Sequence, residues 1–260
     1  MRKKIIFIIA LVILLPPLWY LTHLPKTSEL KTTNPKTSAI RIYREEQKIK
    51  KGKKPHSSMQ WRNLKDISPY LIHAVILAED DTFYRHHGFD FEQLKKAFQE
   101  NWKRKRFAFG ASTITQQLAR TLYLSSHKNL LRKAKEALIT RRLEKTLPKY
   151  RILELYLNVV EWGPEIYGAE AASQHHFGKS SIALTANEAI ALAAILPSPR
   201  KWNPMKENGF MGRRKSILYE RMVRAHHIVS EVEVEESTGS VVSPGSEELP
   251  TDEIGESIKE

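Results

Sequence analysis

Glu79, Asp80 and Asp81 are three consecutive carboxylates at the end of a stretch that otherwise predicts a buried helix. Ser68 and Pro69 are typical of a helix start, because serine caps free N–H groups and proline has none to satisfy. Apolar residues then recur at spacings of three and four and place Glu79 at the end of the stripe that should be buried. Burial and neighbouring acids both raise the pKa of a carboxylate, which suits a general base or acid. The alternative interpretation is a frayed helix end with solvated acids.

A second candidate carboxylate, Glu136, lies within an amphipathic helix predicted over Lys128–Lys145. Arg132 precedes Glu136 by one turn, Lys133 lies beside them, and the same helix face continues into apolar residues. The two cations that flank this carboxylate could bind a phosphate group. The alternative is an ordinary ion pair between Arg132 and Glu136, worth under about 0.5 kcal/mol.

Another helix start is predicted just after position 110. Ser112 or Thr113 can cap it, and Thr113 and Gln116 have the spacing of a capping box. A helix N-terminus with hydroxyls and amides can bind an anion. Arg120 follows Gln117 by about one turn, so the cation and the amides could converge on one ligand. An ordinary capped helix is the simpler interpretation.

Charge is unevenly distributed along the 260 residues. The net charge is +13, and the segment from Glu231 onward holds ten acids and one lysine, a net −9, which leaves +22 on the first 230 residues. Such a basic body suits a polyanion or an anionic surface: nucleic acid, phospholipid or a phosphorylated substrate. There is no cysteine, so disulfides and thiolate chemistry are excluded.

The N-terminal sequence predicts a membrane anchor. Arg2–Lys4 precede an apolar stretch, Ile5–Leu24, close to the roughly 20 residues that a spanning helix needs. A cleavable signal peptide is the alternative, but no small-x-small cleavage site follows. The basic flank keeps the N-terminus cytoplasmic and places the rest of the chain outside.

Composition divides the chain into four parts. Residues 1–24 are the cytoplasmic stub and anchor, and residues 25–60 are a linker with a short strand expected at Ile40–Tyr43. Residues 61–229 have few strand signals and predict a mainly helical domain. Residues 230–260 are an acidic tail without helical periodicity, which we expect to be disordered.

Aromatic and cationic residues alternate along Phe91–Phe109. This pattern fits a nucleic-acid surface. Next to a membrane anchor, it fits a membrane-interface segment better. Core packing of the aromatics with solvated lysines is the third interpretation.

In chain order, these stretches resemble the motifs of the peptidoglycan glycosyltransferases of family 51, particularly the membrane-anchored monofunctional transglycosylases. The first motif is matched by Glu79, Asp80, Phe83, His86 and Gly88, and the second by Gly110, Ser112, Thr113, Ile114, Gln116 and Gln117. The third is matched by Arg132, Lys133 and Glu136, and the fourth by Ile152, Leu153, Glu154, Tyr156, Leu157 and Asn158. The fifth is a looser match, Arg213, Arg214, Ile217 and Leu218. The family usually has lysine at position 120, where arginine keeps the charge and can bind phosphate through two hydrogen bonds.

The resemblance implies a lysozyme-like helical fold of two lobes, with Phe91–Phe109 in a smaller lobe against the membrane. It also implies an extracytoplasmic enzyme, anchored in the bacterial inner membrane, that polymerises lipid II into glycan strands. The expected partners are lipid II, the growing strand, the membrane and other proteins of cell-wall synthesis, with no nucleic acid.

The implied reaction is a single, inverting displacement that releases polyprenyl diphosphate. Glu79 is then the general base, and Glu136 orients cations or protonates the leaving group. The diphosphate is held by a set of polar and cationic side chains: Ser112, Thr113, Gln117, Arg120, Arg132 and Lys133. No cofactor is required, although a divalent cation could bridge diphosphate and carboxylate near Asp80.

Three other functions each fit part of this pattern. A lysozyme-like peptidoglycan hydrolase also uses two carboxylates, but it leaves the cation set unexplained. A basic nucleic-acid-binding protein explains the charge but not the carboxylates. A transpeptidase is disfavoured, because Ser125–Lys128 fits Ser-x-x-Lys only inside the glycosyltransferase motifs and no Lys-Thr-Gly box exists.

Overall fold

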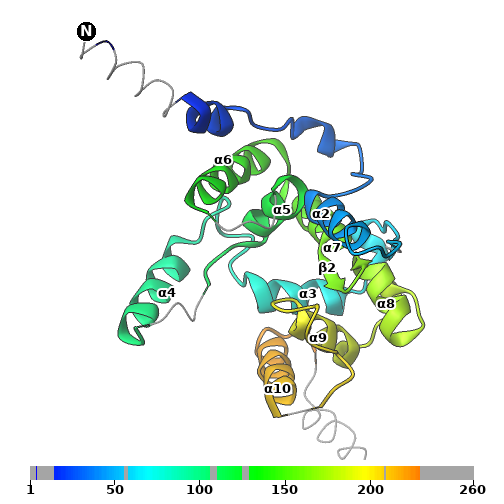
Figure 1. The fold of residues 1–260 in the computed structure, drawn as a ribbon. Coiled ribbons are helices and arrows are strands. Elements are labelled where there is room, and N and C mark those ends of the chain that lie inside the picture. The colour runs from blue at the N-terminus through cyan, green and yellow to red at the C-terminus, as the bar shows by residue number, and fades with distance from the viewer. Residues whose placement is uncertain are drawn as a thin grey trace, which may run out of the picture. The chain divides into compact units, whose positions relative to one another are not determined.

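The computed structural model describes residues 4, 15–55, 58–105, 110–124, 129–207 and 209–228 (Figure 1). Over these residues the chain is mainly helical, which confirms the prediction of a mainly helical domain. The helices are α2 (Ala39–Ile49), α3 (Pro69–Glu79), α4 (Phe91–Lys103), α5 (Ile114–Tyr123), α6 (Leu130–Thr146), α7 (Lys149–Val159), α8 (Ala169–Phe177), α9 (Ala186–Ile195) and α10 (Gly209–Arg224). Short 3-10 helices lie at Ser28–Lys31, Leu64–Asp66 and Ser181–Ala183.

A small sheet joins residues far apart in the sequence. Its strands are β1 (Ser58–Met59), β2 (Glu161–Gly163) and β3 (Ile166–Tyr167), in the order β1-β3-β2. β1 is parallel to β3, and β2 is antiparallel to it. Tyr167 pairs within the sheet, and α8 begins two residues later. Gly168 makes this turn possible, because its φ is 87° and a Cβ there would lie 2.7 Å from the Asn158 carbonyl oxygen.

The core is organised around α7, in which every residue from Arg151 to Val159 is buried. It packs against α5 and also contacts α6 and α8. A second group, formed by α3, α9 and α10, lies below it in Figure 1. The site residues predicted on α3, α5 and α6 are therefore carried by helices that are fixed by their buried apolar faces.

The segment before this core differs from the prediction. The strand expected at Ile40–Tyr43 is wrong: these residues lie in α2, whose N-cap Ser38 accepts a hydrogen bond from the Arg41 N–H at 3.2 Å. A capped start and packing against α5 outweigh an alternation of only four residues. Part of the expected linker is also fixed, because the Arg151 Nε donates to the Leu30 carbonyl at 2.8 Å and Leu30 is buried.

Two predicted segments fall largely outside the described residues. Residues 15–22 are helical, but residues 5–14 of the predicted anchor are not described, so that anchor stays a prediction. Within the described ranges, no helix is both long and apolar enough to cross a bilayer. The acidic tail, residues 230–260, also lies outside them.

The aromatic face of α4 is exposed. Its apolar residues are more than half exposed: Phe91, Leu94, Phe98 and Trp102. Core packing of these side chains is therefore wrong, because α4 buries none of its residues. Phe107 and Phe109 lie outside the described residues.

Candidate active site

The three consecutive acids at the end of α3 have three different environments. Glu79 is partly buried, Asp80 is 5% exposed, and Asp81 is the outermost. Asp81 accepts hydrogen bonds from Gln93 of α4 and Arg221 of α10, both at 2.9 Å. A frayed end with solvated acids is therefore wrong for Glu79 and Asp80.

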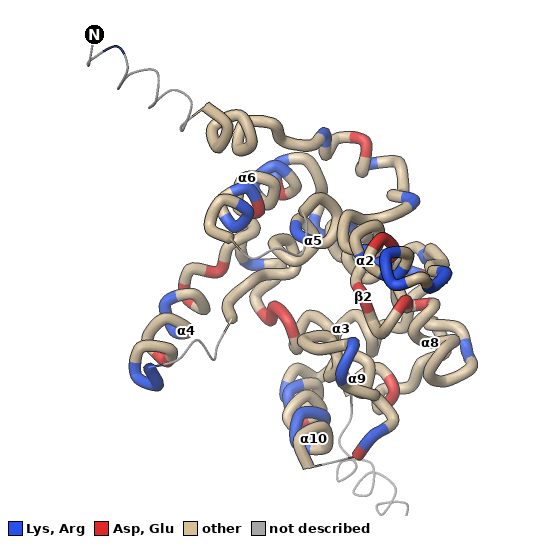
Figure 2. Tube along the Cα trace, viewed as in Figure 1, with Lys and Arg blue, Asp and Glu red and all other residues tan. Residues whose placement is uncertain are grey.

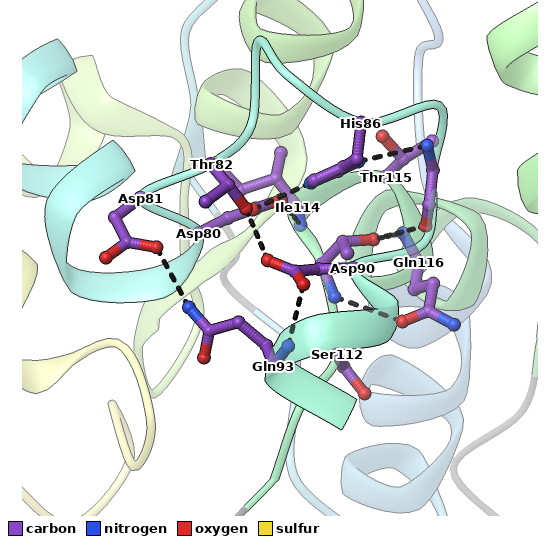
Figure 3. Close-up of polar contacts among 12 residues, drawn as sticks. Asp80, Asp81, Thr82, His86, Asp90, Gln93, Ser112, Ile114, Thr115 and Gln116 are labelled. Carbon is purple, nitrogen blue, oxygen red and sulfur yellow. Dashed lines mark hydrogen bonds and ion pairs between the residues drawn. The ribbon is translucent and has the colours of Figure 1, made fainter. Parts of the chain in front are cut away.

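Asp80 fixes the end of α3 to the start of α5 (Figure 3). One of its oxygens lies 2.8 Å from the His86 Nε2, and the other accepts the Ile114 N–H at 2.9 Å. The Thr113 hydroxyl donates to the Gly88 carbonyl at 2.7 Å and ties the same turn to α5. Both Asp80 oxygens are thus in use, and the described residues hold no cluster of three or more metal-ligating side chains.

The N-terminus of α5 has the predicted capping box. Thr113 accepts the Gln116 N–H at 3.2 Å, and the Gln116 side chain accepts the Thr113 N–H at 3.0 Å. Thr113 is 3% exposed, so we expect it to shape the helix start rather than to contact a substrate directly. Ser112, one residue earlier, remains partly exposed.

Glu79 is held by one amide. Its Oε2 accepts a hydrogen bond from the Gln117 Nε2 at 2.8 Å. Its Oε1 is buried and has no hydrogen-bond partner among the residues that the structure describes. Burial raises the pKa of the Glu79 carboxyl, and the Gln117 bond and the charges of Arg214 and Arg120 only partly oppose this. Such a group suits proton transfer near neutral pH.

Gln117 is in turn oriented from α7. The Tyr156 hydroxyl donates to the Gln117 Oε1 at 3.2 Å, which leaves the Gln117 N–H facing Glu79. Tyr156 is fully buried, and burial raises the pKa of its hydroxyl well above the usual value, so it stays a neutral donor. Three helices thus position the carboxylate through two hydrogen bonds.

Glu136 is fully buried on α6 between two cations. It accepts hydrogen bonds from the Arg132 Nη1, at 2.8 Å, and from the Lys133 Nζ. Asn129 caps α6 by accepting the Arg132 N–H at 2.7 Å. A buried carboxylate that accepts from both neighbours fixes where these cations point. This geometry favours the orienting role for Glu136 over that of an acid.

Ser112 connects the two carboxylate clusters. Its hydroxyl lies 3.3 Å from the Lys133 Nζ, and its carbonyl lies 3.4 Å from the Gln117 Nε2. The contacts from Glu79 through Gln117 and Ser112 to Lys133 and Glu136 are therefore continuous. This is the convergence that the sequence motifs predicted.

A pocket of about 440 Å³, here called the reaction pocket, lies beside these contacts. Gln117, Arg120 and Arg132 line it. Within the described part of the chain, the Arg120 guanidinium makes no hydrogen bond, and the Arg132 Nε is buried without a partner. The pocket therefore offers cationic donors that the fold itself does not use, as an anion site requires.

The comparisons with known proteins agree with this site. A family model described as Transglycosylase matches residues 45–223, more than half of the chain. The chain belongs to the transglycosylase family. A biosynthetic peptidoglycan transglycosylase of Nitrosospira multiformis is 42% identical over 192 residues, 74% of this chain and 84% of that protein. One of Herminiimonas arsenicoxydans is 38% identical over 224 residues, 85% of this chain and 96% of that protein. The family and these relatives confirm the prediction of a peptidoglycan glycosyltransferase.

Sequence reasoning missed three side chains of this transglycosylase site. Tyr156 was matched within a motif, but nothing local pointed to its bond with a residue 39 positions earlier. Arg214 lies near enough to lower the pKa of Glu79, and its Nε donates to the Ala194 carbonyl at 3.0 Å. Arg44 of α2 lines the reaction pocket from a segment that was expected to be a linker.

Proposed function

We propose that this transglycosylase polymerises lipid II into glycan strands by inverting transfer, with release of polyprenyl diphosphate, in bacterial cell-wall synthesis. The observation that carries the proposal is the continuous contact from Glu79 to Lys133 by way of Gln117 and Ser112. It brings a carboxylate of raised pKa next to a cationic pocket. Acid–base chemistry and a diphosphate leaving group require these two features together.

Glu79 is the general base. Its Oε2 is occupied by Gln117, which leaves Oε1 for the acceptor. As the sugar 4-hydroxyl attacks, its oxygen forms a bond to the anomeric carbon of the donor and its proton passes to Glu79. The bond from that carbon to the diphosphate oxygen breaks in the same step. A single displacement of this kind inverts the anomeric carbon and needs no covalent intermediate.

The departing diphosphate is bound by Arg120, Arg132 and Lys133. Arg132 and Lys133 are oriented by Glu136, while Arg120 is left without a hydrogen-bond acceptor in the described ranges. Cations that are positioned before the reaction stabilise charge as it develops on the leaving group. Gln117 adds a polar side chain to the pocket, and Ser112 contacts Lys133 beside it.

The substrate's lipid places the enzyme at a membrane. The apolar stretch Ile5–Leu24 is the single anchor, with the N-terminus cytoplasmic and the catalytic domain outside. The exposed side chains of α4, among them Phe98 and Trp102, contact the bilayer as the smaller lobe of a lysozyme-like fold. In this arrangement the growing strand leaves the site while the lipid remains in the bilayer.

The test is purified full-length protein with lipid II, with the products separated by size. We expect long glycan strands that a muramidase digests. A parallel reaction with finished peptidoglycan distinguishes the transferase from a lysozyme-like hydrolase, because only the hydrolase would release fragments from that substrate. Fragments from finished peptidoglycan, together with no polymer from lipid II, would overturn the proposal.

A further inference from the structure

A second pocket, here called the flanking pocket, adjoins the reaction pocket. It has a volume of about 370 Å³ and lies between α2, the turn that follows α2, and the β2–β3 hairpin. Arg44 lines both pockets, so the two are neighbours through one side chain. Five of its lining residues are cationic, Arg44, Lys48, Lys51, Lys53 and Arg200. Among the described residues that line the pocket, only Glu45 and Glu165 oppose them.

The fold uses only part of this positive charge. Lys48 pairs with Glu165, the Arg200 Nη1 donates to Glu161 at 2.7 Å, and the Arg44 Nε lies 3.7 Å from the same Glu161 carboxylate. Lys51 and Lys53 are exposed and have no ion-pair partner within the described ranges. The pocket therefore keeps excess positive charge after its internal pairs are counted.

Buried donors in the same pocket also lack acceptors. The Tyr167 hydroxyl is buried and has no hydrogen-bond partner among the described residues, and the buried Arg44 Nε has only a distant ion pair with Glu161, at 3.7 Å, and no hydrogen bond there. Tyr167 as a whole is 1% exposed, so its hydroxyl has no route to bulk water on another face. Buried donors of this kind are normally satisfied in a folded protein. An anionic ligand with oxygen acceptors would satisfy them.

We propose that the flanking pocket binds a carboxylate of the peptide carried by the sugar units, an inference that rests on the proposed function. The peptide of peptidoglycan carries free carboxylates, whereas the diphosphate is already assigned to Arg120 and Arg132. A sugar held in the reaction pocket can reach a second anion site only next to that pocket, and Arg44 marks the place where the two meet. The ring of Tyr43, which is partly exposed, lines the flanking pocket and can pack against the peptide chain.

Lipid headgroups are a second source of anions, but the arrangement of the helices disfavours them. The apolar face that suits a bilayer belongs to α4. Figure 1 shows α4 and α2 on opposite sides of the molecule, and Figure 2 shows a separate group of lysine and arginine segments at α2. Binding of lipid headgroups at α2 is therefore an alternative that the experiment must distinguish from binding of the peptide.

The experiment combines two protein variants with two substrates. The test variant is Lys51→Gln with Lys53→Gln. The matched control is Lys50→Gln with Lys54→Gln, which removes the same charge from exposed positions of the same segment that do not line the pocket. The substrates are lipid II with free peptide carboxylates and lipid II with every peptide carboxylate amidated. We expect the test variant to raise KM about three- to tenfold for the free carboxylate only, as for one or two exposed ion pairs.

Three outcomes would overturn the inference. These are an equal change in KM for both substrates, an equal effect of the control variant, or a loss of binding to phosphatidylglycerol vesicles without dependence on the peptide charge. Calorimetry can measure the binding of a soluble sugar-linked peptide with its carboxylates free or amidated. This measurement tests the flanking pocket independently of the proposed function. Charge-dependent binding without polymerisation contradicts the function alone. Polymerisation without any charge dependence contradicts the pocket alone.

Discussion

Gln117 donates its side-chain N–H to Glu79 across 2.8 Å, and this single bond links α5 to the carboxylate at the end of α3. It occupies one Glu79 oxygen and leaves the other for a proton. It also opposes the effect of burial on the pKa of Glu79. Gln117 therefore fixes the orientation of the Glu79 carboxylate and also lowers its pKa.

Replacing Gln117 should change the pH dependence of the reaction. In Gln117→Leu the hydrogen bond that lowers the Glu79 pKa is lost, so the pKa rises further and the base is ionised only at higher pH. We expect the acidic limb of the kcat/KM profile to move to higher pH. At neutral pH, kcat/KM should fall about 10- to 100-fold, the value of a hydrogen bond to a charged group. Gln60→Leu, at an exposed position, is the control. An unmoved profile would remove Gln117 from this role.

Tyr156→Phe should have a smaller effect on the same step. The change removes the hydroxyl that donates to Gln117 and keeps the buried ring. We expect kcat to fall about three- to tenfold and the free energy of unfolding to fall by about 1 kcal/mol, the net value of one hydrogen bond. Steady-state kinetics and thermal unfolding measure the two effects, with Tyr150→Phe, at an exposed position, as the control. Full activity would show that Gln117 needs no support from α7.

Lys133→Ala should abolish turnover without unfolding the protein. The Lys133 ammonium group bonds the fully buried Glu136 and faces Ser112, so its loss also lowers the free energy of unfolding, and thermal unfolding must show that the variant is folded at the assay temperature. We expect a fall in kcat of at least about 100-fold, because a positioned cation acts on the leaving group as charge develops. Lys145→Ala removes the same charge from an exposed position further along α6. Unchanged kinetics in Lys133→Ala would exclude it from the diphosphate site.

The environment of Glu170 predicts that the folded protein loses stability in acid. It is fully buried, and although burial raises its pKa, hydrogen bonds from Arg62 and Ser181 hold the pKa at about 2. Because the folded pKa lies below the unfolded value, its contribution is complete above about pH 4.5 and is lost as the pH falls towards 2. That contribution is roughly 3 kcal/mol. Urea unfolding across this range should show a clearly weaker pH dependence in Glu170→Gln. An identical pH dependence in the two proteins would contradict the assignment.

The parts of this site that were predicted from sequence depend on local patterns. Thr113 and Gln116 form their capping box within one helical turn, and the apolar period of α3 located Glu79 at the edge of the core. Arg132 and Glu136 are likewise one turn apart. Such contacts follow from helix geometry alone, so spacing is enough to predict them.

The parts that were missed depend on contacts between distant segments. Tyr156 meets Gln117 across 39 positions, and β1 pairs with β3 across more than a hundred. The α2 segment gave a weak strand pattern, and only its cap and its packing on α5 make it a helix. Strand propensity over four residues is too weak to outweigh tertiary packing.

The central claim is that Glu79 takes the proton of the attacking sugar, and Glu79→Gln tests it most directly. The amide has the shape of the carboxyl but cannot accept the proton, so lipid II polymerisation should fall by about 100-fold or more while lipid II binding, measured separately, stays within about threefold. Polymerisation at the wild-type rate by a folded Glu79→Gln protein would contradict the account.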